Sequence, residues 1–421
     1  MRIAKLSLVL ILMLCLFKAT HIKRPILDDF HVYETAATLV HQHHSDLMYN
    51  GADTGEDPQV RMADPNSAFA VAARSIGIPK IRLYVYPPLL ADLLLPLTWM
   101  NTRRAGELWN FLNIVEIGLI AVILMKSYNI GWNRVGTIAL FVGAFSFPPV
   151  LNCVLWGQVT ILLLLLWTFG IFGYVRGWIW LSAGAFALAA AIKLTPLIVL
   201  PLFILWKEWK WVRSFVVSLL VLSGLTCLFN GTSTIKNYFG HVMPAMSAGI
   251  ADFENRSLLS SIQVSYIALT SHSIIPHAVM VGSKLVVLLV LVTALLLALP
   301  LRTRSLEARG TALALFAMLA VALSPVSWLH AFAVCFVGLC ALWAKALCDR
   351  TSVFFVILLT CCSFELSASF CTRLAMMVTH SVALSIWMTP LLTIATFMYG
   401  LWLLGARETS HATAHPATLP V

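Results

Sequence analysis

The sequence WIWLSAGAFALAAAIKLTPLIVLPLFIL, residues 178–205, carries only one charged side chain, Lys193. A helix of about 20 apolar residues spans the hydrocarbon layer of a membrane, because its backbone polar groups bond within the helix. Lys193 and Pro196 interrupt the run, and a proline inside a helix removes a hydrogen bond. The run therefore predicts either one long tilted helix or two half-helices that meet at Lys193. This choice decides on which side of the membrane Gly157 and Gln158 lie.

The rest of the chain has a similar composition. Of its 421 residues, 60% are hydrophobic and 11% are charged, against about 25% charged in a typical soluble domain. Candidate spans occur at residues 5–20, 84–100, 107–126, 135–154, 158–175, 178–205, 212–229, 274–300, 309–323, 329–346, 351–371 and 382–404. The sequence predicts an all-α, polytopic membrane protein with about 10–12 transmembrane helices. We expect one domain over residues 1–405 and a disordered tail over residues 406–421.

The excess of lysine and arginine on the cytoplasmic side of a membrane predicts the orientation of these spans. If every run crosses, the basic segments share one side, namely residues 2–5, 101–104, 207–213, 301–309 and 344–350. Both termini then lie in the cytoplasm, and the loops 21–83 and 230–273 lie outside. We therefore interpret the formal net charge of +10 as a consequence of basic segments on the cytoplasmic side of the membrane. The sequence shows no clustered basic patch, so we expect no nucleic-acid partner.

Several enzyme classes lack their motifs in this sequence. It contains no Walker loop, no G-x-G-x-x-G and no G-x-S-x-G, so neither an ATP-driven pump nor a serine hydrolase is indicated. Nine cysteines occur without a C-x-x-C pair, so neither a zinc site nor a disulfide framework is indicated. A multi-pass lipid or sugar transporter or flippase remains the alternative to an enzyme, although the internal repeat of many transporters is absent from the sequence.

Four clusters of polar residues lie in or beside the apolar runs. They are residues 28–34, Lys193 with Pro196, residues 253–261 and residues 324–330. Polar and ionisable groups are costly to place in a membrane, so those that occur there are generally functional. By the predicted orientation, the first, third and fourth clusters lie on the outer face. This distribution favours an enzyme whose site opens at the outer surface over a transporter.

Six motifs follow one another along the chain: DDFHVYETAATLV (28–40), YVYPPLLADLLLPL (84–97), GQVTILLLLL (157–166), AAAIKLTPLIVLPL (189–202), NRSLLSSI (255–262) and SPVSWLH (324–330). In order and approximate spacing they resemble glycosyltransferase family 87, a branch of the GT-C polytopic sugar transferases. The resemblance implies transfer of mannose from a polyprenyl-phosphate donor to a lipid or glycan acceptor, with inversion. It further implies a multi-pass protein of the cell membrane that contacts membrane lipid and has its active site on the external, periplasmic side.

The resemblance places the general base at Asp29, the acidic residue directly before the F-H-V-Y sequence. An acceptor hydroxyl becomes a better nucleophile when a carboxylate takes its proton, which contributes about 10² to 10⁴ in rate. The leaving phosphate needs positive charge or hydrogen-bond donors, for which Lys193, Arg256 and His330 are the candidates. The polyprenyl-phosphate donor is already activated, so no cofactor is expected.

Further substrate-binding candidates are Asp28, Tyr33 and Asn255. Asn255 is also a candidate N-cap of an amphipathic surface helix that contains Leu258, Leu259 and Ile262.

Two metal sites stay open as alternatives, although we expect no bound metal. The paired carboxylates of Asp28 and Asp29 are compatible with a divalent cation, and the sequence HQHH (41–44) is compatible with a histidine site. Tyr84 and Tyr86 are expected in the interfacial belt, at the outer start of the second span.

Overall fold

The computed structural model describes residues 2–21, 25–50, 62–127, 134–272, 274–348 and 351–406. Within these residues every regular element is a helix, and the only strand-like pairing is an isolated bridge between Met62 and Arg82. The prediction of an all-α protein is therefore confirmed. The predicted C-terminal tail lies, from residue 407 onward, outside the described residues.

In chain order, with η for 3₁₀ and π helices, the elements are α1 (Arg2–Ala19), α2 (Asp28–His41), η1 (Ser45–Leu47), α3 (Ala68–Ser75), α4 (Leu89–Leu93), η2 (Leu95–Trp99), α5 (Thr102–Ser127), α6 (Arg134–Ser146), α7 (Pro148–Trp156), α8 (Thr160–Val175), α9 (Ile179–Ile192), η3 (Thr195–Ile198), α10 (Val199–Leu205), α11 (Trp209–Asn237), η4 (Tyr238–Val242), α12 (Met243–Ser247), α13 (Leu258–Thr270), α14 (His277–Ala298), η5 (Leu299–Thr303), α15 (Leu306–Leu323), η6 (Leu329–Val334), α16 (Cys335–Cys348), α17 (Val353–Ala368), α18 (Phe370–Thr379), α19 (Val382–Ser385) and α20 (Met388–Ala406).

Within the described residues, six helices are long and apolar enough to cross a membrane, or eight if each of two bent pairs counts as one span. The bent pairs are α6 with α7, bent by 43°, and α17 with α18, bent by 89°. α8, α9 and the η3–α10 segment are apolar but shorter. The multi-pass prediction is confirmed. The full-length spans are fewer than the predicted 10–12, because several apolar runs are short or broken.

The apolar run 84–100 does not form a span. It folds into the short elements α4 and η2, with Pro96 in the first turn of η2, where proline is tolerated but does not continue the preceding helix. The end of the run stays close to the loop before it, since the Thr102 hydroxyl donates to the Ile76 carbonyl over 3.0 Å. The predicted position of residues 101–104 on the opposite side from that loop is therefore wrong.

The run 178–205 is broken at Lys193, as in the second of its two predicted forms. α9 ends at Ile192, and Lys193 has extended backbone angles (φ −151°, ψ 130°) before η3 begins at Thr195. Pro196 lies in the first turn of η3, where its missing N–H has no partner to lose. The break places Lys193 in the wall of the same cavity as Gln158.

The core of the bundle surrounds α15. All of its residues from Ala312 to Leu323 are buried, and it packs against α16, α20 and α8. α9 in turn packs against α8 and α11. α14 differs, because it exposes large apolar side chains such as Leu285, Leu289 and Leu296. A helix with this pattern is suited to face lipid on one side and protein on the other.

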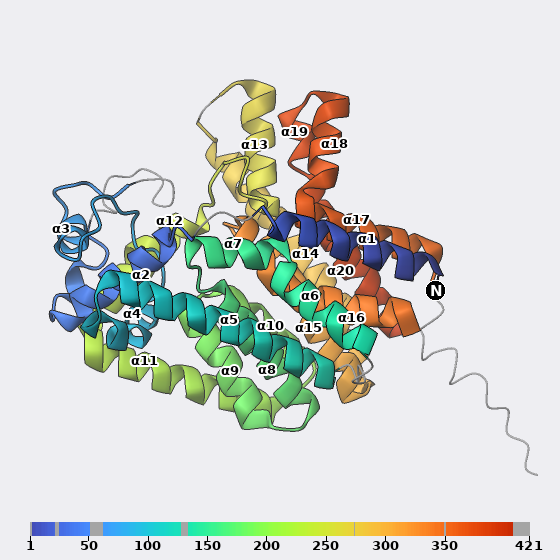
Figure 1. Ribbon diagram of the computed structural model, residues 1–421, viewed down its shortest axis with the longest axis horizontal. Coiled ribbons are helices and arrows are strands. Elements are labelled where there is room, and N and C mark those ends of the chain that lie inside the picture. The colour runs from blue at the N-terminus through green and yellow to red at the C-terminus, as the bar shows by residue number, and fades with distance from the viewer. Residues whose placement is uncertain are drawn as a thin grey trace, which may run out of the picture.

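α13 and the pair α18–α19 lie side by side and project from the bundle (Figure 1). The N-cap of α13 is Ser257, whose hydroxyl accepts from the Ser260 N–H over 3.0 Å. The prediction of Asn255 as the N-cap is therefore wrong. Leu258 and Leu259 are buried, because α13 packs against α14 and α19 instead of lying free on a membrane surface.

Candidate active site

One large cavity, of about 1040 Å³, lies where the predicted motifs meet. Its wall is formed by the first turns of α2, residues 82–87, the turn between α7 and α8, the break between α9 and η3, residues from 243–256, one face of α14, and the turn between α15 and η6. Elements far apart in the sequence thus share one site. The sequence-predicted residues that line it are Asp29, Tyr33, Lys193, Arg256 and His330.

The segment just before α2 is held against the turn at the end of α7. The N–H groups of Ile26 and Leu27 both donate to the Leu155 carbonyl, at 2.7 and 3.1 Å. Gly157 in the same turn has a φ of +70°, and a Cβ built there would lie 2.6 Å from Phe30 Cβ. Glycine is therefore needed at this position both for its backbone conformation and for the close approach of α2.

Gly157→Ala should reduce activity by displacing α2. The added methyl group would overlap with Phe30 Cβ, so α2 and Asp29 must move, and a shift of about 1 Å near a reacting group can cost about 10²-fold in rate. We expect the transfer rate to fall at least about tenfold while the circular dichroism spectrum stays helical. Gly177→Ala is the matched control, because Gly177 also has a positive φ (+75°) but no atom lies within 4 Å of its Cβ position. Equal losses in both variants would contradict a role for the position of α2.

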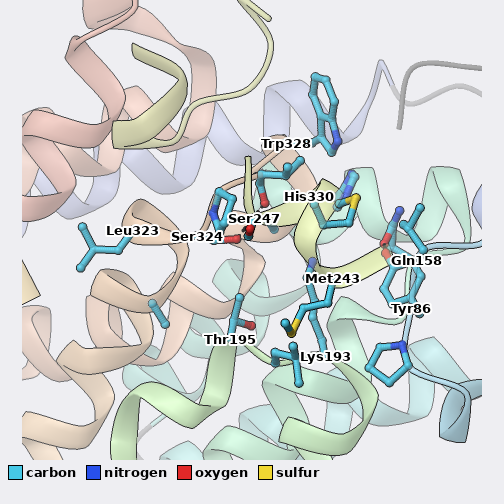
Figure 2. A pocket seen from close by; sticks show the side chains of 18 of the residues that line it. Tyr86, Gln158, Lys193, Thr195, Met243, Ser247, Leu323, Ser324, Trp328 and His330 are labelled. Carbon is cyan, nitrogen blue, oxygen red and sulfur yellow. Dashed lines mark hydrogen bonds between the residues drawn. The ribbon is translucent and has the colours of Figure 1, made fainter. Parts of the chain in front are cut away.

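A buried amide connects Asp29 to two tyrosines. Gln158 Nε2 donates to Asp29 Oδ2, while Gln158 Oε1 accepts from the Tyr33 hydroxyl at 3.0 Å and from the Tyr86 hydroxyl at 3.3 Å. The rings of Tyr33 and Tyr86 meet edge to face, with their centroids 5.0 Å apart. Figure 2 shows Gln158 and Tyr86 next to each other on the cavity wall. The carboxylate is thus part of a connected hydrogen-bond network.

The environment of Asp29 raises the pKa of its carboxyl group from 3.8 to about 6. Burial is the main cause, because it disfavours the charged form, and the neighbouring charge of Asp28 acts in the same direction. The hydrogen bond from Gln158 and the charges of Arg82 and Lys193 offset this effect only in part. A carboxylate with a pKa of about 6 is mostly ionised at neutral pH and is a stronger base than an ordinary aspartate.

Two cationic side chains line the cavity near aromatic rings. Lys193 Nζ lies 5.8 Å from the centre of the Tyr86 ring, and the Arg82 guanidinium carbon lies 5.8 Å from the centre of the Trp156 ring. Cations at this distance from an aromatic face are attracted by the ring quadrupole. An aromatic ring carries no counter-charge, so both side chains can interact with an anion in the cavity.

His330 and Arg256 reach the cavity from other elements. His330 follows Leu329 at the start of η6 and is 9% exposed, on the part of the wall that also carries Trp328 (Figure 2). Arg256 lies just before α13, and its Nη1 atom is buried without a hydrogen-bond partner. A buried guanidinium donor of this kind is suited to bind a ligand oxygen.

Asn255 does not line the cavity. Its Nδ2 donates to the carbonyls of Ile250 and Pro325, at 2.9 and 3.1 Å, and its Oδ1 accepts from the Ser327 N–H at 2.8 Å. The side chain therefore joins the segment before α13 to the turn after α15. Its observed contacts are structural, and they hold the neighbouring Arg256 in place.

The two adjacent carboxylates of α2 have different surroundings. Asp29 faces the cavity, whereas Asp28 is exposed and does not line it. Among the residues that the structure describes, no three His, Cys, Asp or Glu side chains come together in a way that could hold a metal ion. In the HQHH sequence, His41 Nδ1 instead lies 3.0 Å from the hydroxyl of Thr98.

Arg82, Tyr86 and Gln158 line the cavity but were not predicted as site residues. Gln158 and Tyr86 do occur in two of the six motifs, and a buried amide beside an apolar run is a signal that could have singled out Gln158. Tyr84 is buried and Tyr86 lines the cavity, so both rings pack within the protein, and their place in the interfacial belt stays a prediction. Arg82 lies outside every motif, and no sequence signal marks it.

These features define a polytopic membrane protein in which a carboxylate and several cations share one large cavity. The sequence model of glycosyltransferase family 87 matches residues 84–327, more than half of the chain. The chain belongs to this family and is a membrane glycosyltransferase. The match contains Gln158, Lys193 and Arg256, but it begins after Asp29 and ends before His330. No curated protein matches the chain.

Proposed function

We propose that this glycosyltransferase transfers mannose from a polyprenyl-phosphate donor to a hydroxyl group of a lipid or glycan acceptor, with Asp29 as the general base. The observation that carries the proposal is the presence of Asp29, Lys193 and Arg82 in the wall of one cavity. A carboxylate can take the acceptor proton, and the cations can stabilise the leaving phosphate. No cofactor is needed, because the donor phosphate is itself the leaving group.

The reaction is a single displacement. The acceptor oxygen forms a bond to the anomeric carbon while the bond from that carbon to the phosphate oxygen breaks. The hydroxyl proton passes to Asp29, and the electron pair of the broken bond leaves with the phosphate, near Lys193 and Arg82. Because the acceptor attacks from the side opposite to the leaving group, the configuration at the anomeric carbon inverts.

The apolar part of the cavity wall supports a lipid-linked donor. Leu197 and Pro201 line it from the segment after Lys193, and Val287 and Leu291 line it from α14. α14 also exposes a large apolar face to its surroundings. A polyprenyl chain can therefore lie along this wall with its phosphate at Lys193, so that one cavity accepts both the apolar and the anionic ends of the donor.

We propose that the cavity opens on the external side of the cell membrane. The predicted cytoplasmic segments 207–213 and 301–309 meet through an ion pair between Glu208 and Arg309. Arg304, in the segment 301–309, donates a hydrogen bond to the Gly405 carbonyl over 3.0 Å. The positive-inside rule assigns such a basic cluster to the cytoplasm, and none of these residues lines the cavity that contains Asp29.

Labelling of an engineered cysteine should test this orientation. Asp46 is exposed after α2, so the Asp46→Cys variant should react with a membrane-impermeant thiol reagent in intact cells. The native Cys348 is also exposed but ends α16 on the predicted cytoplasmic side, so it should react only after lysis. If the reagent labelled Cys348 in intact cells but not the cysteine introduced by Asp46→Cys, the proposed orientation would be inverted.

The activity itself is tested with purified protein in lipid vesicles, a panel of radiolabelled polyprenyl-phosphate sugars and a membrane lipid extract as the acceptor source. We expect label to move from the mannose donor to the extract. Transfer of a different sugar alone would overturn the assignment of mannose. Movement of the intact donor across the vesicle without any transfer would favour a transporter or flippase.

A further inference from the structure

We propose that Gln158 is a positioning residue that fixes the Asp29 carboxylate for proton transfer, and that Tyr33 and Tyr86 anchor the oxygen of its amide. The inference rests on the proposed role of Asp29 as the base. Gln158 is 2% exposed and Tyr33 is fully buried, so the centre of this network is shielded from water. Its geometry is therefore set by the protein.

The orientation of the Gln158 amide follows from its partners. Its oxygen lies 3.0 Å from the Tyr33 hydroxyl and 3.3 Å from the Tyr86 hydroxyl, both of which donate to it. If the amide flipped, its oxygen would face Asp29 Oδ2 and two acceptors would meet in a buried place, which is unfavourable. The carboxylate thus keeps Nε2 directed at Oδ2, and the two tyrosines hold the amide oxygen in place.

This arrangement makes the two carboxylate oxygens of Asp29 different. Oδ2 accepts the hydrogen bond from Gln158, whereas no donor among the described residues is bonded to Oδ1. Oδ1 is then the atom that takes the proton of the acceptor hydroxyl as that oxygen bonds to the anomeric carbon. Gln158 neither gains nor loses a proton in this step. It holds the carboxylate plane and stabilises the ionised form.

The titratable groups around Asp29 must be considered in any pH experiment. The charges of Asp28, Arg82 and Lys193 affect the pKa of the Asp29 carboxyl group. The charge of Asp29 in turn affects the pKa values of Cys153 and of the hydroxyls of Tyr33 and Tyr86. Burial raises the pKa of the Tyr33 hydroxyl well above its ordinary value, so it stays a donor throughout the working range. Loss of the Gln158 hydrogen bond is therefore not accompanied by ionisation of Tyr33 near neutral pH.

The test uses Gln158→Met, which keeps the length of the side chain and removes both hydrogen-bonding groups. We expect kcat to fall about 10- to 100-fold. We also expect the acidic limb of the pH profile of kcat/KM to move to higher pH, because a hydrogen bond that favoured the ionised carboxylate is lost. A purely structural role would lower the yield of folded protein without moving this limb.

Gln263→Met is the matched control. Gln263 is also 2% exposed and donates to a backbone carbonyl, that of Ala248, over 2.9 Å, but it does not line the cavity. It should leave both kcat and the pH limb unchanged. Tyr33→Phe is the second test variant if Gln158→Met does not fold. It should cause a smaller loss of kcat and also move the acidic limb of the pH profile of kcat/KM to higher pH.

A double-mutant cycle separates this inference from the proposed function. If Gln158 acts through Asp29, Gln158→Met should cause no further loss in an Asp29→Asn background. A further loss there, or a wild-type kcat and pH limb for Gln158→Met, would overturn the positioning role while leaving Asp29 as the base. Full activity of Asp29→Asn would overturn the proposed function and, with it, this inference.

Discussion

Asp29→Asn should lower kcat for sugar transfer about 10²- to 10⁴-fold, with a much smaller change in donor affinity. Asparagine has nearly the size of aspartate, and its amide oxygen can still accept the hydrogen bond from Gln158 Nε2. Folding and binding should therefore survive while the capacity to take a proton is lost. Steady-state kinetics with a labelled donor, together with a direct measurement of donor binding, separate these two quantities.

The same residue should determine the acidic limb of the wild-type pH profile. Asp29 must be ionised to accept a proton, and burial raises the pKa of its carboxyl group to about 6. Activity is therefore full well above this pH, and log kcat/KM should fall with a slope of one as the pH drops below about 6. An aspartate of ordinary pKa would place this limb about two pH units lower. In Asp29→Asn the limb should disappear from the residual activity.

Asp28→Asn is the matched control for the base. It makes the same chemical change one residue earlier, at an exposed side chain that does not line the cavity, so its effect should stay below about tenfold. If Asp28→Asn were inactive and Asp29→Asn active, the base would be the other carboxylate of the pair. Full activity of both variants would show that neither carboxylate of α2 acts as a general base.

The fold class could be predicted because its cause is local. Apolar runs long enough to cross a membrane are visible in the sequence itself, and each helix satisfies its own backbone. The run 84–100 shows where this reasoning fails. Its composition matches that of a span, but its prolines divide it into α4 and η2, and its first residues line the cavity. Apolar composition alone does not distinguish a span from a buried, broken segment.

The site was predictable only in part, because hydrogen-bond partners distant in the sequence are not visible there. Asp29, Lys193 and His330 line the cavity, while their roles there stay predictions. Asn255 lies in a motif like theirs, yet its side chain bonds to backbone groups of Ile250 and Ser327. A motif residue that binds a ligand and one that holds the loop beside it have the same appearance in the sequence. The tertiary contacts that distinguish them form only on folding.

Lys193→Met should lower kcat/KM for the donor about 10²- to 10³-fold, mainly by weakening the stabilisation of the leaving phosphate. Methionine keeps much of the apolar side chain, so the break between α9 and η3 should be preserved and the protein should fold. Lys193→Arg should restore part of the activity, because it returns a positive charge with a different shape at the same place. Kinetics at varied donor concentration give both kcat and KM.

Lys284→Met supplies the control for loss of a lysine from an apolar helix. Lys284 lies on α14 but is exposed and does not line the cavity, so its replacement should leave donor kinetics unchanged. A wild-type KM and kcat for Lys193→Met would show that Lys193 merely extends its charge toward water, as lysines near helix ends commonly do. If Lys193→Met loses activity, Lys193→Arg regains part of it and Asp29→Asn still binds the donor, two residues of one cavity have different roles. Lys193 then stabilises the leaving phosphate, and Asp29 takes the proton of the acceptor.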